Sequence, residues 1–399
     1  MPARSLGRAL LGLEGALALS TGYQLALLAG ASRTLRRRPE APPSDDPQSR
    51  FVVLIPAHDE EHGIGATLSS LAESTYPPER LRTVVIADNC SDLTAVRARD
   101  AGVEAWERVH DERGKGFALI WALERLREAQ DGYDAVVVLD ADCLVSPNML
   151  EQMDRALRAG AEAVQVSYVI GNPEDSHASA LRFAAFALMA TVRPLGKQGF
   201  GLSSGLFGTG MGFTKELLHS EPWSATGLVE DFEYHLRLVD AGRRVEFLPR
   251  AWVRSAMPTS FAASGDQQAR WEQGKLQVIR NWSLRLVLSG LRRGDPTRVH
   301  AGLEHLVPPQ SLIAAGSLAS LCGGLLLRSR GLAALATAIA MAQLTFVVVG
   351  LRLVQAPAQV YRALLFAPVL IAGKVALYLK LLSGGGPTSW VRTEREGAS

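Results

Sequence analysis

Acidic residues follow two apolar, β-branched runs of this chain, at points where buried strands are expected to end. Asp88 closes VVIAD, and Asp140 and Asp142 follow VVVL. Such runs are typical of parallel strands buried on both faces, and ligands bind at the carboxyl ends of those strands. In an extended D-A-D triplet the two carboxylates point the same way. Hard oxygen ligands on one side suit Mg²⁺ or Mn²⁺ that is also held by phosphate oxygens.

Each of these acids also has a structural alternative. Asp140 and Asp142 could be ordinary surface acids, and Asp88 could cap a helix over residues 91–99. Their shared position directly after strands favours a common crevice instead. The sequence PAHDE at residues 56–60 ends another strand, so we expect it to join the same crevice.

A cationic turn lies between the strands. The sequence RGKG at residues 113–116 opens a helical stretch, and its flexible backbone, two cations and helix dipole suit a phosphate group. It is not a P-loop, because GxxxxGK[ST] is absent. The glycine-rich stretch 208–212 lacks the dinucleotide-binding spacing and predicts a tight turn that lines a pocket.

A third group of residues offers a base, hydrogen bonds and a stacking surface. Glu230 and Asp231 begin a helical stretch, and Gln267, Arg270 and Trp271 follow in QQARW. Acids in a first helical turn are common because of the helix dipole, and Trp271 could anchor an amphipathic helix at a membrane interface. The order of all these motifs along one stretch gives them functional meaning. Together they suit a metal, a diphosphate, a general base and a sugar ring.

The elements that must position these residues alternate between strand and helix. Strands are predicted from Phe51, Val84 and Ala135, with helical patterns over 64–71 and 116–126. This alternation implies right-handed crossovers and an α/β fold with a mostly parallel sheet and helices on both faces. Further strands are predicted over 162–170 and 243–248, whereas 172–214 is expected to be loop-rich.

Apolar residues are concentrated near the two ends of the 399-residue chain. A hydrophobic content of 47% and a mean hydropathy of +0.08 are high for a soluble protein, and the excess lies in residues 6–30 and 305–383. The stretches 305–327 and 331–353 predict a hairpin of two membrane spans. The last stretch, 360–383, carries three basic residues, which favours an interfacial or re-entrant helix over a third span.

Charge distribution predicts which side of the membrane the central domain occupies. Arginines between residues 33 and 38 follow the first apolar run, and such clusters stay on the cytoplasmic side. A cleavable signal peptide is the alternative for this run. The net charge of +2 says little, but basic residues crowd 270–298 and favour an anionic membrane face over nucleic acid. The three cysteines have no metal-ligand spacing.

With these motifs in order, residues 50–282 resemble the family 2 glycosyltransferases, the inverting, nucleotide-sugar-dependent membrane enzymes that include cellulose, chitin-oligosaccharide and hyaluronan synthases. The order D, D-x-D, E-D and Q-x-x-R-W carries the resemblance. Ceramide glucosyltransferases are similar in length, in the order of the acidic motifs and in having one N-terminal membrane segment. The resemblance implies a GT-A fold, a UDP-sugar donor and Mg²⁺ or Mn²⁺.

The resemblance also implies a role for each motif residue. It places Asp231 as the general base and Asp142 as the metal ligand. The residues that it implies for nucleotide-sugar binding are Ala57, Glu60, Asp88, Lys115 and Asp140. Those that it implies for the acceptor and the diphosphate are Gly210, Glu230, Gln267, Arg270 and Trp271.

We therefore expect four parts: an N-terminal transmembrane anchor over 1–38, a GT-A domain over 50–270, a basic amphipathic interface segment over 271–300, and C-terminal membrane or interface helices over 301–399. The expected activity is transfer of a hexose or N-acetylhexosamine from a UDP-sugar to a glycan or lipid acceptor with a β-linkage. We expect it in exopolysaccharide or cell-envelope glycan synthesis, at the inner (plasma) membrane with the domain in the cytoplasm and without nucleic acid.

The small number of predicted spans bears on the product. Processive synthases carry more membrane segments, so a polymer made here would need export through a homo-oligomer or a partner. Two alternatives remain open at this point. One is a glycolipid synthase that makes a single transfer, like ceramide glucosyltransferases, and the other is a catalytically inactive membrane scaffold.

Overall fold

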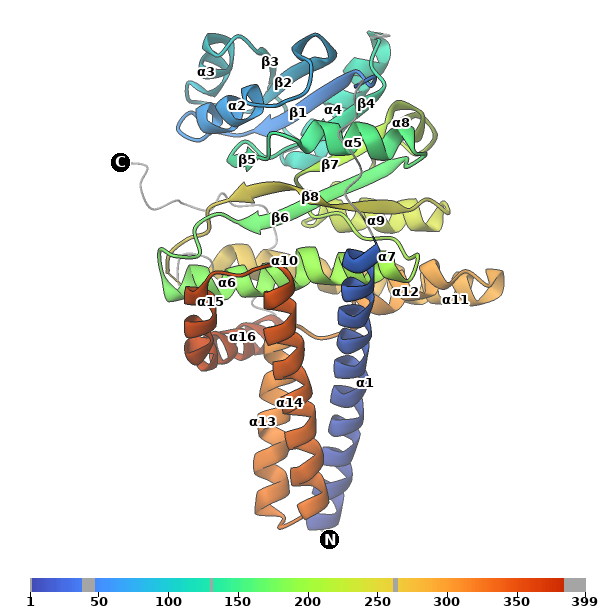
Figure 1. Ribbon diagram of the computed structural model, residues 1–399, viewed down its shortest axis with the longest axis vertical. Coiled ribbons are helices and arrows are strands. Elements are labelled where there is room, and N and C mark those ends of the chain that lie inside the picture. The colour runs from blue at the N-terminus through green and yellow to red at the C-terminus, as the bar shows by residue number, and fades with distance from the viewer. Residues whose placement is uncertain (1, 38–46, 130–131, 261–264, 384–399) are drawn as a thin grey trace.

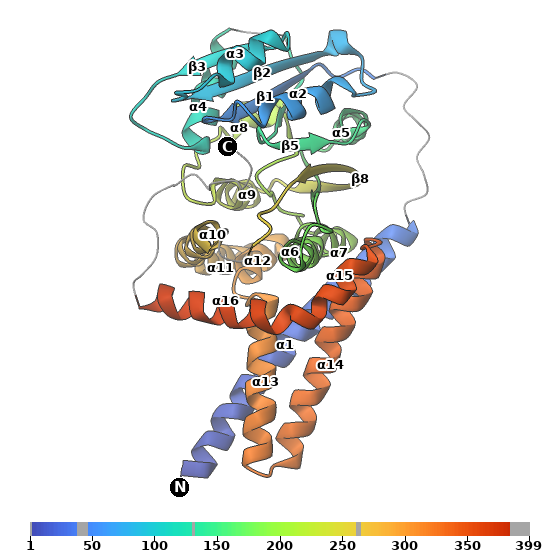
Figure 2. The same cartoon turned by 90° about the vertical axis from the view of Figure 1, so that its left-hand side faces the viewer.

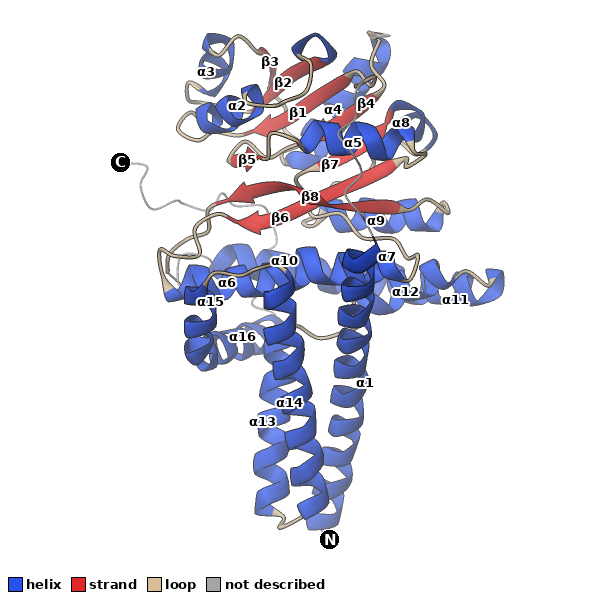
Figure 3. Ribbon diagram, in the orientation of Figure 1, coloured by secondary structure: helices blue, strands red, loops and turns tan. Residues whose placement is uncertain are grey.

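The computed structural model describes residues 2–37, 47–129, 132–260 and 265–383. These residues form three layers that Figure 1 shows from top to bottom: an α/β domain, a layer of helices lying across it, and a helical bundle that stands away from both. Figure 3 shows that every strand lies in the uppermost layer.

The α/β domain contains an eight-stranded sheet in the order β3-β2-β1-β4-β7-β6-β8-β5. The strands are β1 (Phe51–Ala57), β2 (Leu81–Asp88), β3 (Glu104–Arg108), β4 (Ala135–Val138), β5 (Cys143–Val145), β6 (Ala163–Ile170), β7 (Met211–Thr214) and β8 (Val245–Ser255). The pairs β1–β2, β2–β3, β1–β4 and β6–β8 are parallel. The pairs β4–β7, β6–β7 and β5–β8 are antiparallel. The predicted mixed α/β fold with a mostly parallel sheet is therefore confirmed.

Helices cover both faces of the sheet because its central strands are apolar on both sides. Val53 and Ile55 of β1 pack into the core under α2 (Ile64–Ala72), α3 (Thr94–Asp100) and α5 (Met149–Arg158). Val52 and Leu54 point the other way, into the core under α4 (Lys115–Glu128), α8 (Lys215–Ser220) and α9 (Glu230–Asp240). Side chains alternate across a strand, so a run of consecutive apolar residues must be covered twice.

The expectation of a loop-rich segment over 172–214 is wrong for its first half. Residues 177–199 form α6 (His177–Ala187), a π-helical turn (Leu188–Val192) and α7 (Arg193–Gly199). The Ser176 and Ser179 side chains cap the start of α6 reciprocally. Almost every side chain between Ala178 and Ala184 is buried, so the sequence lacks the polar stripe by which a surface helix is predicted.

The layer beneath the sheet is completed by helices from the predicted interface segment. These are α10 (Gly265–Val278), a π-helical turn (Ile279–Ser283), α11 (Leu284–Arg293) and α12 (Pro296–Glu304). Figure 1 shows them lying across the molecule alongside α6 and α7. This layer connects the α/β domain to the bundle.

The bundle consists of α1 (Pro2–Arg37), α13 (Gln310–Leu326) and α14 (Arg330–Leu353). Polar side chains meet inside it: Ser320 donates to the Glu14 carboxylate at 2.6 Å, and the Gln343 amide donates to Ser317 at 3.0 Å. Glu14 is fully buried, so this acid lies between helices rather than on the outer face of the bundle. Figure 2 shows that α15 (Ala358–Ala363) follows α14 and that α16 (Ala367–Leu382) then runs across the bundle.

Three helical stretches in the described residues are long and apolar enough to cross a membrane, namely 177–199, 330–353 and 358–381. The first lies mostly buried between the sheet and the bundle, so protein rather than lipid covers its apolar surface. Helix α13 is a shorter apolar helix that packs along α14. Helix α1 approaches α7 closely, because a Cβ at Gly196 would lie only 2.3 Å from the Leu27 carbonyl oxygen.

Candidate active site

One cavity of about 1580 Å³ contains nearly all of the predicted site residues. It begins at the carboxyl ends of β1, β2 and β4 and extends down through the helical layer to the bundle. Its lining includes Ala57, Glu60, Asp88, Lys115, Asp140, Asp142, Glu230, Asp231, Arg270 and Trp271. Residues more than 200 positions apart in the sequence, such as Ala57 and Trp271, are thus brought to one site.

Two predicted residues are not among the described lining of the cavity. Gly210 lies behind the cavity wall, where a Cβ would meet the Val166 side chain at 2.4 Å and the Val253 side chain at 2.7 Å. The glycine is needed there for close packing between neighbouring strands. Gln267 lies in the first turn of α10, and its side chain falls outside the described part of the structure.

Lys115 joins two walls of the cavity. Its ammonium donates to Asp140 Oδ1 at 2.5 Å and to the Gly208 carbonyl oxygen at 2.5 Å. Burial alone would lower the pKa of Lys115, but Asp140, Glu230 and Asp231 outweigh it and raise the pKa above its ordinary value. The side chain is therefore a permanent cation at the amino end of α4, where a helix also favours anions.

The packing of α4 explains why Lys115 stands between glycines. Gly114 has φ +121°, a conformation that few other residues adopt. A Cβ at Gly116 would approach the Ala225 carbonyl oxygen to 2.4 Å. The start of the helix is thus pressed against the segment that leads into α9, which brings Lys115 towards the acids of that helix.

Asp140, Asp142 and Cys143 can place ligand atoms within 4.8 Å of one another. The Asp140 backbone N–H donates to the Thr209 hydroxyl at 3.1 Å, which fixes the turn after β4. Cys143 is fully buried, whereas the two carboxylates line the cavity. Two carboxylates on the open side suit a hard divalent cation, so this donor set fits Mg²⁺ or Mn²⁺.

Asp88 is held by a cation that the sequence analysis missed. Arg108 at the end of β3 donates to Asp88 Oδ1 at 2.6 Å, and both side chains are buried. The Asn89 amide donates to the same oxygen at 3.1 Å. A basic residue at the end of an adjacent strand is a signal that could have identified this partner.

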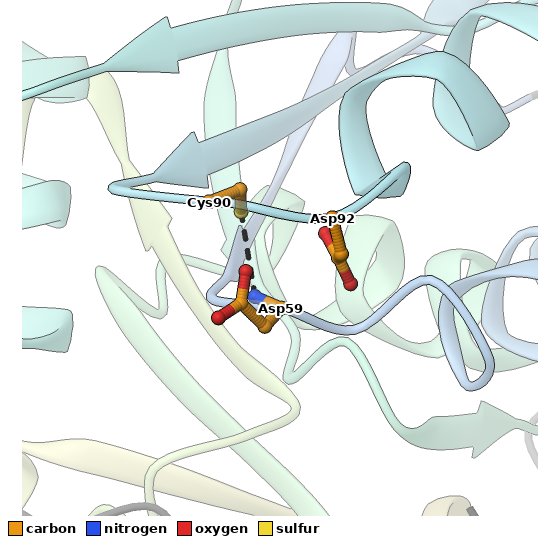
Figure 4. A group of neighbouring side chains, drawn as sticks. All are labelled: Asp59, Cys90 and Asp92. Carbon is orange, nitrogen blue, oxygen red and sulfur yellow. Dashed lines mark hydrogen bonds between the residues drawn. The ribbon is translucent and has the colours of Figure 1, made fainter. Parts of the chain in front are cut away.

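A second acidic cluster nearby has a structural role. Figure 4 shows Asp59, Cys90 and Asp92 together at the ends of β1 and β2. Asp59 Oδ1 accepts from the Ser91 backbone at 2.7 Å, and Asp92 Oδ2 accepts from the Glu61 backbone at 2.9 Å. These bonds join the two loops that carry Glu60 and Asp88 to the cavity, so they account for the acids without a metal.

Glu230 and Asp231 begin α9 at the centre of the cavity. Burial raises the pKa of Asp231 to about 7. The negative charge of Glu230 adds to this effect, and the positive charge of Lys115 opposes it. Burial likewise raises the pKa of Glu230. A carboxylate that titrates near neutrality is well suited to accept a proton from a substrate hydroxyl.

Gly208 keeps the space between the base and the cation open. It has φ +82°, and a Cβ there would lie 3.6 Å from Asp231 Oδ2 and 3.6 Å from Lys115 Nζ. Any side chain at this position would stand between the two charged groups. The glycine-rich turn was predicted to line a pocket, and Gly208 rather than Gly210 does so.

Helix α10 presents Arg270 and Trp271 to the same cavity. Burial lowers the pKa of Arg270, while Glu230 and Asp140 act in the opposite sense, which places the guanidinium in the field of both acids. Trp271 makes an edge-on contact with Phe186, with the ring centroids 5.8 Å apart. The tryptophan therefore both packs against α6 and offers surface to the cavity.

Comparison with known proteins gives consistent matches to the α/β domain. The sequence model named Glycosyltransferase like family 2 matches residues 47–274. A probable glycosyltransferase, YdaM, of Bacillus subtilis is 24% identical over 244 residues, which cover 58% of this chain and 56% of the relative. The probable glucomannan 4-beta-mannosyltransferase 14 of Arabidopsis thaliana is 22% identical, with 62% of this chain and 48% of the relative covered. The chain thus spans about half the length of these relatives.

Among solved structures, the mannosyltransferase PcManGT from Pyrobaculum calidifontis, in complex with GDP-Man and Mn²⁺, is similar over almost its whole length. The TM-score is 0.51 at 19% sequence identity, with 86% of this chain and 97% of that chain covered. A likeness at this identity concerns the fold, and it includes the mostly parallel sheet that forms the cavity.

Proposed function

The chain belongs to the glycosyltransferase like family 2, and on that premise we propose that it transfers a hexose or N-acetylhexosamine from a UDP-sugar to a glycan or lipid acceptor with inversion. The observation that carries the proposal is the convergence of Asp140, Asp142, Lys115 and Asp231 on one cavity. A metal site, a fixed cation and a base near neutral pKa are the three parts that this transfer needs.

The reaction follows from the positions of these groups. Asp231 takes the proton of an acceptor hydroxyl as its oxygen bonds to the anomeric carbon and the bond to the diphosphate breaks. Lys115 and Arg270 stabilise the negative charge of the departing diphosphate. Asp140 and Asp142 would hold Mg²⁺ or Mn²⁺, and the ion would supply further positive charge to that group. A single displacement on an α-linked donor gives a β-linked product.

We place the enzyme in the plasma membrane, with α1 and the α13–α14 hairpin in the bilayer and the α/β domain in the cytoplasm. The arginines at the end of α1, next to the α/β domain, support this orientation. Helix α16 runs across the bundle, and α11 lies in the helical layer to one side of it, as interfacial helices would. We also predict that the enzyme participates in cell-envelope or exopolysaccharide synthesis. A further prediction is that it works as a homo-oligomer or with an export partner.

The test is release of UDP from a panel of UDP-sugars by the purified full-length protein with Mn²⁺. We expect one or a few donors to be consumed, EDTA to abolish release, and Mn²⁺ or Mg²⁺ to restore it. Asp142→Asn should require much more metal than the wild type. Full release in EDTA would refute the metal site, and no release with any UDP-sugar or acceptor would refute the proposed donor.

A further inference from the structure

The cavity does not end at the catalytic acids. Beyond Trp271 it continues between α13, α14 and α16, where its walls include Leu318, Leu344, Val347, Leu370 and Ile371. The polar side chains of Gln343 and Ser317 also line it, and they are bonded to each other. Leu318 is 63% exposed and Leu344 is 50% exposed although both line the cavity, so this apolar limb opens on the outer surface of the bundle. In the orientation proposed above, that surface faces the bilayer.

A cation lies where the catalytic part of the cavity meets the apolar limb. Lys275 is four residues after Trp271, one turn or about 6 Å further along α10. Its ammonium donates to the Val307 carbonyl oxygen at 3.2 Å. In the described part of the chain no carboxylate oxygen lies within 4 Å of it, because the neighbouring Glu272 is paired with Lys374 at 2.6 Å.

The pKa of Lys275 shows that burial destabilises its positive charge. Burial, which the surrounding acids offset only in part, lowers the pKa of Lys275 to about 8. A partly buried cation with no carboxylate within ion-pair distance is stabilised by an anion that binds beside it. The lysine lines the cavity, so such an anion would reach it from within.

The amino end of α13 faces the same place. Pro309 precedes the helix without a side-chain cap, and Pro309, Gln310 and Ser311 line the cavity. Backbone N–H groups and the dipole at the start of a 17-residue helix favour an anion. Two independent features, the lysine and the helix, therefore converge on one point.

We propose that the acceptor is a membrane lipid with an anionic phosphate headgroup and a free hydroxyl. Its phosphate lies between Lys275 and the first turn of α13, its hydrocarbon occupies the apolar limb, and its hydroxyl reaches Asp231 past Trp271. The hydroxyl proton passes to Asp231 and a carbon–oxygen bond to the sugar forms, while the bonds of the lipid phosphate stay intact. This inference rests on the proposed function and narrows its acceptor.

The chemistry of the apolar limb argues against a growing glycan in the same position. Leucine, valine and isoleucine side chains offer no hydrogen bonds to sugar hydroxyls, which would be desolvated there without compensation. They suit acyl or isoprenoid chains, which need no hydrogen bonds and can enter the limb from the bilayer without passing through water. The experiment must therefore be able to detect transfer of the sugar to a free oligosaccharide.

The experiment follows labelled sugar from the donor selected by UDP release into either an organic or an aqueous phase. The full-length protein is offered vesicles of phosphatidylglycerol, a polyprenyl diphosphate-linked N-acetylglucosamine, or a soluble β-glucan oligosaccharide. Label in one of the two lipids identifies the source of the headgroup and supports the inference. Label only in the oligosaccharide overturns it while leaving the proposed function intact.

Variants test the position of the phosphate. Lys275→Gln should raise the KM for the phosphate-bearing lipid about 10-fold or more, the size expected for one charge-assisted hydrogen bond, and should raise the KM for the UDP-sugar much less. Lys275→Arg should restore most of the lipid affinity. Lys380→Gln on the exposed side of α16 is the matched control and should change neither KM. Equal KM values for the lipid in Lys275→Gln and in the wild type would overturn the assignment, provided that the melting temperatures agree.

Discussion

Asp231 carries the proton transfer in the proposed reaction, and its surroundings determine the pH at which it can act. Its pKa is raised to about 7 by burial and by Glu230. A general base works when it is deprotonated, so turnover should rise as the pH rises through about 7 and then level off. The initial rate of UDP release between pH 5.5 and 9 measures this directly.

Substitution of Asp231 supplies the companion measurement. Asp231→Asn preserves the shape of the side chain, and we expect turnover to fall by about 10² or more because the base is lost. Glu233→Gln, on the same helix but paired with Arg237, is the control and should retain activity. A pH-independent wild type together with an active Asp231→Asn variant would remove Asp231 from the mechanism.

Gly208 offers a test of the space between base and cation. Gly208→Ala places a methyl group near Asp231 and Lys115 and also forces alanine into φ +82°, at a cost of about 1 kcal/mol. Gly201→Ala has similar backbone strain at φ +69° but meets no atom within 4 Å. We expect both variants to lose a few degrees of thermal stability and only Gly208→Ala to lose turnover beyond that. Equal turnover in the two variants would contradict the role of this opening.

The sequence predicted site residues wherever a local pattern marked them. Asp140 and Asp142 stand directly after an apolar strand, so their position at the sheet edge followed from the pattern. The pairing of Arg108 with Asp88 depends on which strands are neighbours, which the pattern does not specify. Gly210 shows that a glycine in a motif can be required for packing instead of ligand binding. Here it leaves room for the side chains of Val166 and Val253.

At the scale of elements, the alternation of strands and helices was predictable. A helix buried on one face repeats its apolar residues at a fixed spacing, and a strand buried on both faces is a short continuous apolar run. Helix α6 was missed because it is buried almost all round, which removes the period. The position of α16 against α10 was also beyond prediction. Its polar contacts include the ion pair of Lys374 with Glu272 at 2.6 Å, between residues about 100 positions apart.

This ion pair predicts how α16 is held. Both side chains are largely buried, and Tyr378 also donates to Glu272. Lys374→Met should release α16, lower the melting temperature and increase hydrogen exchange over 367–382, because it leaves Glu272 without its cation, at a cost of about 1–3 kcal/mol. Lys380→Met should have no such effect. The exchanged pair Glu272→Lys with Lys374→Glu should recover part of the protection, and unchanged exchange in Lys374→Met would show that other contacts hold the helix.

At the scale of the whole molecule, the α/β domain and the bundle lie on opposite sides of the helical layer, and the cavity extends from one to the other. The orientation in the membrane predicts reciprocal labelling of two cysteines in a Cys322→Ala background. A cysteine at Gly171, exposed beside the α/β domain, should react only after the cytoplasmic face is opened. A cysteine at Gly331, at the far tip of the α13–α14 hairpin, should react from outside intact cells. The reverse pattern would place the domain outside and exclude a cytosolic UDP-sugar as its donor.

The stereochemistry of the product tests the central claim most directly, since a single displacement assisted by Asp231 must invert the anomeric centre. The measurement is the proton NMR coupling at the new linkage, recorded on product from the first turnovers with an α-linked UDP-sugar. We predict a β-linked product from the wild type. An α-linked product would contradict the proposed single displacement and the role of Asp231 as its base.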